Sequence, residues 1–168
     1  RYMSNKKSVQ KSSSKVTSTM SATLFKDITR LIDDAKQHVA REYCSTQAIL
    51  CWLIGKRIDE EVLQAERAEY GEAIVTSLSK ELTLLYGKGY SRPNLFRMIK
   101  FAKQYPNREI VSTLSRQLSW SHFVIISSLD EDLKRDFYAE MCRLQRWRVR
   151  ALQKHINGML YERTALSK

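Results

Sequence analysis

Three histidines and one short acidic–basic motif are the candidates for catalysis in this sequence. His38, His122 and His155 stand singly, without the spacing of an H-E-x-x-H zinc motif or a nearby cysteine ligand. Residues 132–134, Asp-Leu-Lys, lie in a helical pattern, whereas a metal-dependent nuclease centre needs acids on adjacent strands to hold a divalent cation. We therefore predict no catalytic residue, no metal site and no cofactor in this chain.

Basic side chains at helical spacing predict binding chemistry instead. A helix over residues 92–104 would be about 20 Å long and would fit a DNA major groove. Its basic residues would meet phosphates, its N-terminal residues would approach base edges or a phosphate, and a neighbouring tyrosine would stack on a base. The predicted nucleic-acid-binding residues are Lys88, Tyr90, Ser91, Arg92, Asn94, Arg97, Lys100 and Lys103.

A second basic patch lies towards the C-terminus. It comprises Arg143, Arg146, Arg148 and Arg150. These arginines would either extend a nucleic-acid footprint or bind the acidic face of a partner. The commonest fate of charged residues on a helix, solvation of an exposed face, is the alternative for both basic sets.

The segment 70–105 must position the first set. An apolar stripe at helical spacing runs through residues 74–85, Gly87 and Gly89 interrupt it, and Ser91 is a good N-cap for a second helix with Pro93 in its first turn. Two short helices joined by a tight glycine-containing turn, the second of them cationic, are typical of a helix-turn-helix.

The net charge and the composition indicate which kinds of partner and which location to expect. The net charge is +11, and residues 1–20, 88–116 and 134–154 contribute net charges of +5, +6 and +5. This excess implies affinity for polyanions or an anionic surface. No apolar run is long enough to span a bilayer, and the three cysteines show no C-x-x-C pairing. We expect a cytoplasmic protein with free thiols and no membrane partner.

The remaining pattern is helical, and five glycines and two prolines leave few breakpoints. Residues 1–20 are expected to be a disordered basic tail, and residues 21–168 a helical domain. Apolar stripes at residues 24–39 and 50–62 predict either one long helix or two within residues 22–66, and we favour two with a break near Cys44–Thr46. A further helix is expected from Ser119, although its apolar residues 124–126 also suit a strand. Others are expected from Asp130 to about Cys142, with Leu133, Phe137 and Met141 facing inward, and over about residues 148–163. The prediction is all-α, with six or seven packed helices, an internal helix-turn-helix and room for winged-helix-like elements.

Four blocks of residues are together similar to a known family. They are Trp52-x-x-Gly55 with Ala68-x-Tyr70-Gly71, Leu78-Ser79-x-Glu81-Leu82 with Gly87-x-Gly89-Tyr90-Ser91 and Asn94-Leu95, Leu118-Ser119-Trp120-Ser121-His122, and Trp147-x-Val149-Arg150-x-Leu152 with Leu160-Tyr161-Glu162-Arg163. In this order they resemble the N-terminal helical domain of the bacterial YhcG-like proteins. Two departures are Arg148, where the family usually has a small capping residue, and Tyr43-Cys44, where it often has Asn.

The resemblance implies that this helical domain precedes a C-terminal PD-(D/E)xK nuclease-like domain. We expect the chain to be the N-terminal part of such a protein, whose nuclease-like domain would then be one of its partners. Trp52, Gly71, Trp120, His122 and Trp147 are expected to be structural residues of the motif blocks. For the tryptophans this means core packing, and for His122 a buried hydrogen bond that ties a helix start to a neighbouring element.

The sequence leaves three hypotheses for the function. The first is a DNA-binding module that targets an attached nuclease-like domain, mainly through phosphate contacts. The second is a protein-interaction or dimerisation module, in which long amphipathic helices within residues 22–66 form a homodimer. The third is an RNA-binding arm led by the basic tail.

Overall fold

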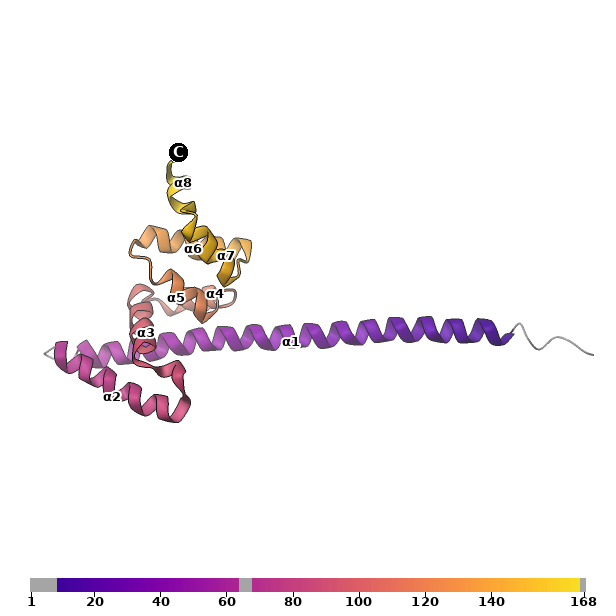
Figure 1. Cartoon of the computed structure of the whole chain (residues 1–168), viewed down its shortest axis with the longest axis horizontal. Coiled ribbons are helices and arrows are strands. Elements are labelled where there is room, and N and C mark those ends of the chain that lie inside the picture. The colour runs from indigo at the N-terminus through magenta and orange to yellow at the C-terminus, as the bar shows by residue number, and fades with distance from the viewer. Residues whose placement is uncertain (1–8, 64–67, 167–168) are drawn as a thin grey trace, which may run out of the picture. The chain divides into compact units, whose positions relative to one another are not determined.

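The computed structural model describes the backbone of residues 9–63 and 68–166, and side chains within residues 23–62 and 69–166. This part of the chain contains eight α-helices, one 3₁₀ turn and no strand (Figure 1). The elements are α1 (Val9–Leu63), α2 (Ala68–Tyr86), η1 (Lys88–Tyr90), α3 (Arg92–Gln104), α4 (Arg108–Ser115), α5 (Trp120–Ile126), α6 (Asp132–Gln145), α7 (Val149–Asn157) and α8 (Leu160–Leu166). The all-α prediction is confirmed, whereas the described residues form no winged-helix-like element.

Helix α1 is one helix, so the break predicted near Cys44–Thr46 is wrong. No proline or glycine interrupts it before Gly55. Ser45 does not end a helix but reaches a neighbouring element, with its Oγ 3.1 Å from Oγ of Ser115. The helix also includes residues 9–20 of the predicted tail, while residues 1–8 lie outside the described residues. By their contacts, residues 1–40 and 41–168 form two separate units.

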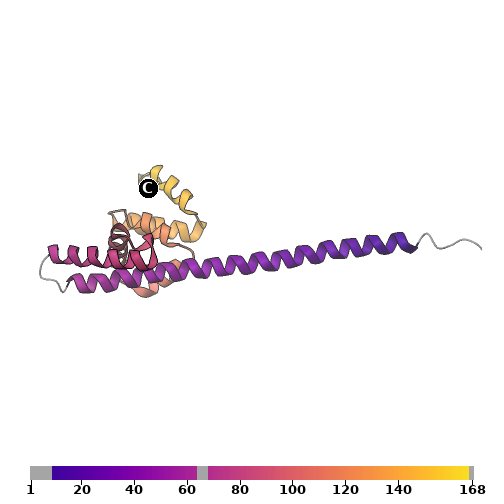
Figure 2. The ribbon, with the colours of Figure 1, turned by 60° about the horizontal axis from the view of Figure 1, so that its bottom comes forward.

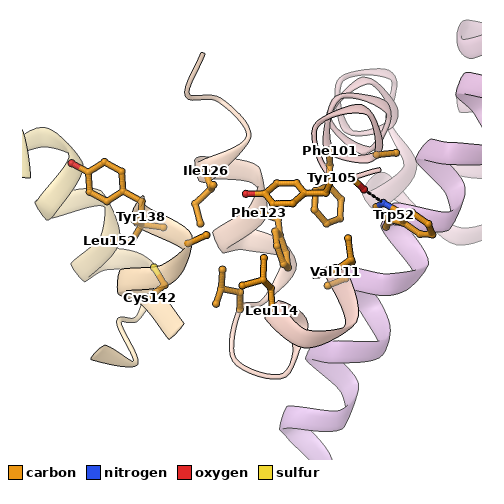
Figure 3. Close-up of a cluster of buried hydrophobic side chains, with 14 residues drawn as sticks. Trp52, Phe101, Tyr105, Val111, Leu114, Phe123, Ile126, Tyr138, Cys142 and Leu152 are labelled. Carbon is orange, nitrogen blue, oxygen red and sulfur yellow. Dashed lines mark hydrogen bonds between the residues drawn. The ribbon is translucent and has the colours of Figure 1, made fainter. Parts of the chain in front are cut away.

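The core of residues 41–168 is built on aromatic rings from several helices (Figure 3). Phe101 is fully buried, with its ring centroid 4.5 Å from that of Phe123 and 5.5 Å from that of Tyr105. Trp52 of α1 is buried as expected, and its indole Nε1 donates a 2.7 Å hydrogen bond to the carbonyl oxygen of Tyr105. Tyr138 brings α6 into the same core. Helix α3 therefore lies at the centre of the packing.

The helix pair predicted around residue 87 is present. Helix α2 ends at Tyr86, Gly87 has a φ of 91°, and α3 spans the predicted residues 92–104. A left-handed φ of this kind favours glycine, because it has no Cβ. Helix α2 runs beside the C-terminal part of α1 (Figures 1 and 2), where a Cβ at Gly71 would lie 2.7 Å from Cγ1 of Val62. Gly71 thus allows these two helices to approach each other.

The C-terminal half departs from the expected pattern in three places. A short helix, α4, follows Asn107, whose side chain accepts a 2.7 Å hydrogen bond from the Glu109 amide. Glu131 replaces Asp130 as the N-cap of α6, and Leu133 is 73% exposed. The helix predicted over residues 148–163 is divided at Gly158 and Met159, because Met159 takes a positive φ of 53°.

The inward face of α6 comprises Arg135, Tyr138, Ala139 and Cys142. Arg135 is buried because its guanidinium donates to the carbonyl oxygens of Leu129 and Asp130, at 2.8 and 3.0 Å. These bonds close the turn before α6 and rotate Leu133 towards solvent. A polar residue therefore takes the buried position that hydrophobic periodicity assigned to a leucine.

Gly55 marks the closest approach of α1 to α3. A Cβ at this position would clash with the Met98 carbonyl and lie 2.9 Å from the Ile99 amide nitrogen. Both obstacles are backbone atoms of α3, which side-chain rotation cannot move. Trp52 lies one turn earlier on α1, so the tryptophan and glycine of the first motif block both contact α3.

We expect Gly55→Ala to lower the free energy of unfolding by about 2 kcal/mol or more, because the added methyl would force α1 and α3 apart. Urea unfolding followed by far-ultraviolet circular dichroism would measure the loss. Gly89→Ala is the matched control, since nothing lies within 4 Å of its added Cβ. Equal stability of the two variants would contradict the close approach.

Candidate nucleic-acid interface

Helix α3 divides into a buried face and a basic face. Its buried side chains are Leu95, Met98, Ile99, Phe101 and Ala102. Arg97, Lys100 and Lys103 are exposed on the other side, as the sequence spacing predicts. The packing that anchors α3 thus leaves its three basic side chains accessible.

Acidic residues from other elements neutralise part of this basic face. Lys103 Nζ lies 3.1 Å from Asp59 Oδ1 on α1, and Lys100 Nζ lies 3.7 Å from Asp130 Oδ1 in the turn before α6. The net charge of residues 88–116 overstates the local field, because it counts acids near in sequence and misses acids near in space. Charge counting along the chain could not identify these partners.

The two lysine pairs differ in strength. Asp130 is 95% exposed, so its pair with Lys100 is open to solvent and contributes little, whereas Asp59 is only 17% exposed. A phosphate could readily take the place of Asp130, and less readily that of Asp59. Lys100 is therefore the more readily released of the two lysines.

The N-terminal end of α3 is tied down by side-chain hydrogen bonds. Arg97 donates a 2.6 Å bond to Asn94 Oδ1, and Asn94 Nδ2 donates a 3.1 Å bond to the Gly89 carbonyl. Arg92 pairs with Glu72 of α2 at 3.3 Å. Ser91 occupies the N-cap position, but its side chain makes no capping bond. Of the residues predicted to approach bases, Asn94 and Arg92 are thus already engaged within the protein.

The 3₁₀ turn η1 carries the other two predicted residues. Lys88 is exposed, whereas Tyr90 is half-buried, packs on the core cluster formed by α1, α2 and α3, and meets Tyr86 edge to face at 5.9 Å. Tyr90 is therefore a packing residue in this conformation and a poor platform for a base.

A cavity of about 410 Å³ lies beside the basic face of α3. Arg97 and Lys100 line it together with apolar side chains of α5 and α7, among them Ile125 and Ile156. Ser127 also lines this cavity and is 4% exposed. Two exposed cations of α3 therefore line a partly apolar cavity.

The second basic patch does not form one surface. Arg143 pairs with Glu140 on α6 through two bonds of 2.5 and 2.8 Å. Arg146 and Arg148 line a different cavity, which also includes Arg41 and Arg116. Arg150 is exposed and is not part of that lining. Sequence reasoning missed Arg41 and Arg116, because only the tertiary structure brings them near Arg146 and Arg148.

His122 has the hydrogen bonds expected of a residue that ties a helix start to a neighbour. The Ser119 amide donates to His122 Nδ1 at 3.1 Å, and His122 Nε2 lies 2.9 Å from the Trp147 carbonyl oxygen. Since Nδ1 accepts and the carbonyl can only accept, the proton must be on Nε2. The imidazole is neutral in this arrangement, and it joins the N-terminus of α5 to the turn before α7.

Burial lowers the pKa of His122 from its usual value of 6.5, against a smaller opposite effect of the bond to Trp147. A second proton would have to sit on Nδ1, where it would face the Ser119 amide donor. The native state thus favours the neutral form. Trp147 itself stacks on His155, with ring centroids 3.9 Å apart.

The remaining reactive groups are inert or dispersed. Burial raises the pKa values of Cys51 and Cys142 to about 12, so both thiols stay protonated at neutral pH. Among the described residues, no three His, Cys, Asp or Glu side chains are grouped to hold a metal ion. Within the same residues, no helix is both long and apolar enough to cross a membrane.

The fold and the site together define an all-α domain with a basic helix at its centre. Residues 27–163 match the family described as the DUF1016 N-terminal domain, and the chain belongs to this family. A protein of Escherichia coli (strain K12) named "Putative nuclease YhcG" is 29% identical over 170 residues. The match covers 83% of this chain and 45% of that protein, so the chain spans about half the length of this relative. No solved structure matches the chain.

We expect His122→Ala to lower the free energy of unfolding by about 1–3 kcal/mol at pH 7.5, because the Trp147 carbonyl and the Ser119 amide lose their partner. Wild-type stability should be complete above pH 6.5 and should decline as the pH falls below it, since the unfolded chain then binds a proton that the folded chain resists. Urea unfolding at pH 5 and 7.5 would measure both effects.

His122→Gln is the matched control, because a glutamine three residues after the cap can accept from the Ser119 amide but cannot titrate near neutral pH. It should lose the pH dependence between 7.5 and 5. The carboxyl groups of Glu140 and Glu162, whose pKa values are lowered from 4.5 by their basic partners, act only below that range. An unchanged pH dependence in His122→Gln would exclude His122 as its source.

Proposed function

We propose that this chain is a DNA-binding module that targets an attached nuclease-like domain to nucleic acid, mainly through phosphate contacts. The observation that carries the proposal is the basic face of α3, where Arg97 and Lys100 are exposed beside the 410 Å³ cavity. Helices α2 and α3 with the turn between them act as a helix-turn-helix, in which α3 is the recognition helix.

Two features support phosphate contact over extensive base readout. Arg97 and Lys100 are exposed cations in the middle of α3, and the polar side chains of Asn94 and Arg92 at its N-terminus are held by other protein groups. Lysine and arginine contacts of this kind bind the backbone with little dependence on sequence. The nuclease-like partner domain rests on the name of the Escherichia coli relative, of which the chain spans about half.

We expect the double change Arg97→Glu with Lys100→Glu to weaken binding to a labelled duplex and to flatten the slope of log Kd against log salt by about 2, because two phosphate contacts are lost. Fluorescence anisotropy across a salt series would measure both. Lys80→Glu, at an exposed site on α2, is the control for a general change in charge.

A companion variant with glutamine at Lys6, Lys7, Lys11 and Lys15 tests whether the basic N-terminal segment, residues 1–20, accounts for the binding. If α3 makes the DNA contacts, this variant should still bind the duplex. If binding disappears with the tail charges and survives the changes at α3, the tail is a non-specific polycation and the proposal is wrong.

A second candidate function, self-association, rests on a separate observation. Within residues 23–40, one side of α1 carries a row of exposed apolar side chains, here called the α1 apolar face: Leu24, Phe25, Ile28, Leu31, Ile32 and Val39. Their exposed fractions lie between 47% and 72%. A row of this length needs a partner to be buried, and an identical helix of a second chain could bury it by coiled-coil packing.

For this candidate, we expect Val39→Asp to convert a dimer into a monomer, because a charge would enter the packed seam. Light scattering coupled to gel filtration would give the molar mass. Ala40→Asp is the matched control, since Ala40 is exposed and lies about 100° further around the helix. A monomeric wild type, or equal loss in both variants, would rule out this seam.

A further inference from the structure

Four arginines from three separate segments surround the second cavity, here called the arginine cavity. Arg41 comes from α1, Arg116 follows α4, and Arg146 and Arg148 flank the turn between α6 and α7. The rest of the lining is Gln117, His122, Trp147 and Val149, so it contains no acidic residue. The cavity has a volume of about 530 Å³.

Three of these arginines, Arg116, Arg146 and Arg148, bring positive charge to the cavity without an acidic partner in the described part of the chain. Among the described residues, no carboxylate lies within ion-pair distance of Arg116, Arg146 or Arg148. The basic face of α3 differs, because Lys100 and Lys103 each have an acidic neighbour. Like charges gathered in a concave wall repel one another and focus a positive potential into the cavity, so an anion would relieve this repulsion.

The wall between Arg146 and Arg148 is rigidly placed. The bond from His122 holds the Trp147 carbonyl at 2.9 Å, and Trp147 stacks on His155. Arg146 takes the left-handed conformation that ends α6, with φ 51° and ψ 41°. The backbone that carries these two arginines is thus fixed, while their exposed side chains can adjust to a ligand.

The size and chemistry of the cavity point to one class of ligand. Arginine guanidinium groups form paired hydrogen bonds to phosphate oxygens. Inorganic phosphate alone would fill little of 530 Å³, whereas Trp147 and Val149 offer an apolar wall for a sugar and base. We propose that the arginine cavity binds the terminal phosphate of a nucleoside 5′-phosphate, either as the end of a nucleic-acid strand or as a free nucleotide.

This site is independent of the interface on α3, because none of the eight residues assigned to that interface lines it. A strand end would need no contact with the middle of α3, and duplex binding through α3 would need no free end. The two sites can therefore succeed or fail separately in experiments.

The test compares two oligonucleotides of one sequence, with a dye at the 3′ end and either a phosphate or a hydroxyl at the 5′ end. Anisotropy with the full chain should show about tenfold tighter binding of the phosphorylated strand, the effect of an additional charge-assisted contact. The double variant Arg116→Ala with Arg148→Ala should lose this preference. Arg150→Ala removes a neighbouring exposed arginine outside the lining and should keep it.

A second arm titrates the chain with a nucleoside 5′-monophosphate by calorimetry, using the same variants. Binding that the double variant abolishes, without a preference for phosphorylated ends, assigns the cavity to a free nucleotide. A preference for phosphorylated ends assigns it to strand ends. Absence of both effects, or equal losses in the double variant and Arg150→Ala, overturns the proposal. Thermal melting of each variant confirms that it is folded.

Discussion

The contact between α1 and α3 is the constraint on which the rest of the domain depends. Gly55 lets the two backbones meet at Met98, and Trp52 adds a hydrogen bond to the carbonyl at the end of α3. Helix α3 then supplies Phe101, around which the rings of α5 and the side chains of α6 and α7 assemble. Because one face of α3 is buried in these contacts, its basic residues lie on the opposite face. The same packing that builds the core thus determines where the basic face is presented.

Much of the backbone follows from local sequence signals. Gly87 and Ser91 with Pro93 predict the end of α2 and the start of α3, because a left-handed residue and a capped first turn depend on neighbours in sequence. Local signals were misleading where a distant group decided the outcome. The break expected near Cys44–Thr46 is absent, and Ser45 within that stretch contacts Ser115 from a distant part of the sequence. Leu133, expected in the core, is exposed, and Arg135 takes an inward position where it bonds to two backbone carbonyls.

The candidate sites show the same limit in electrostatic terms. Spacing correctly places Arg97, Lys100 and Lys103 on one exposed face, since helical periodicity alone determines it. The acids that oppose two of these cations come from positions 59 and 130, far away in the sequence. Conversely, Arg41 joins the arginine cavity from outside any charge-rich block, and Arg116 comes from a different block from Arg146 and Arg148. The attraction and repulsion between charged side chains depend on their distances in space. A count of charges along the sequence does not give these distances.

The cap of α5 has a further electrostatic consequence. The usual residue three positions after a serine cap is glutamate or glutamine, and here it is His122, which also lines the arginine cavity. A glutamate at this position could complete the same cap, but it would add a fixed anion to the cavity wall and compensate part of the arginine charge from within. A neutral imidazole closes the helix end without such an internal counterion. The positive potential of the cavity therefore remains directed at molecules outside the protein.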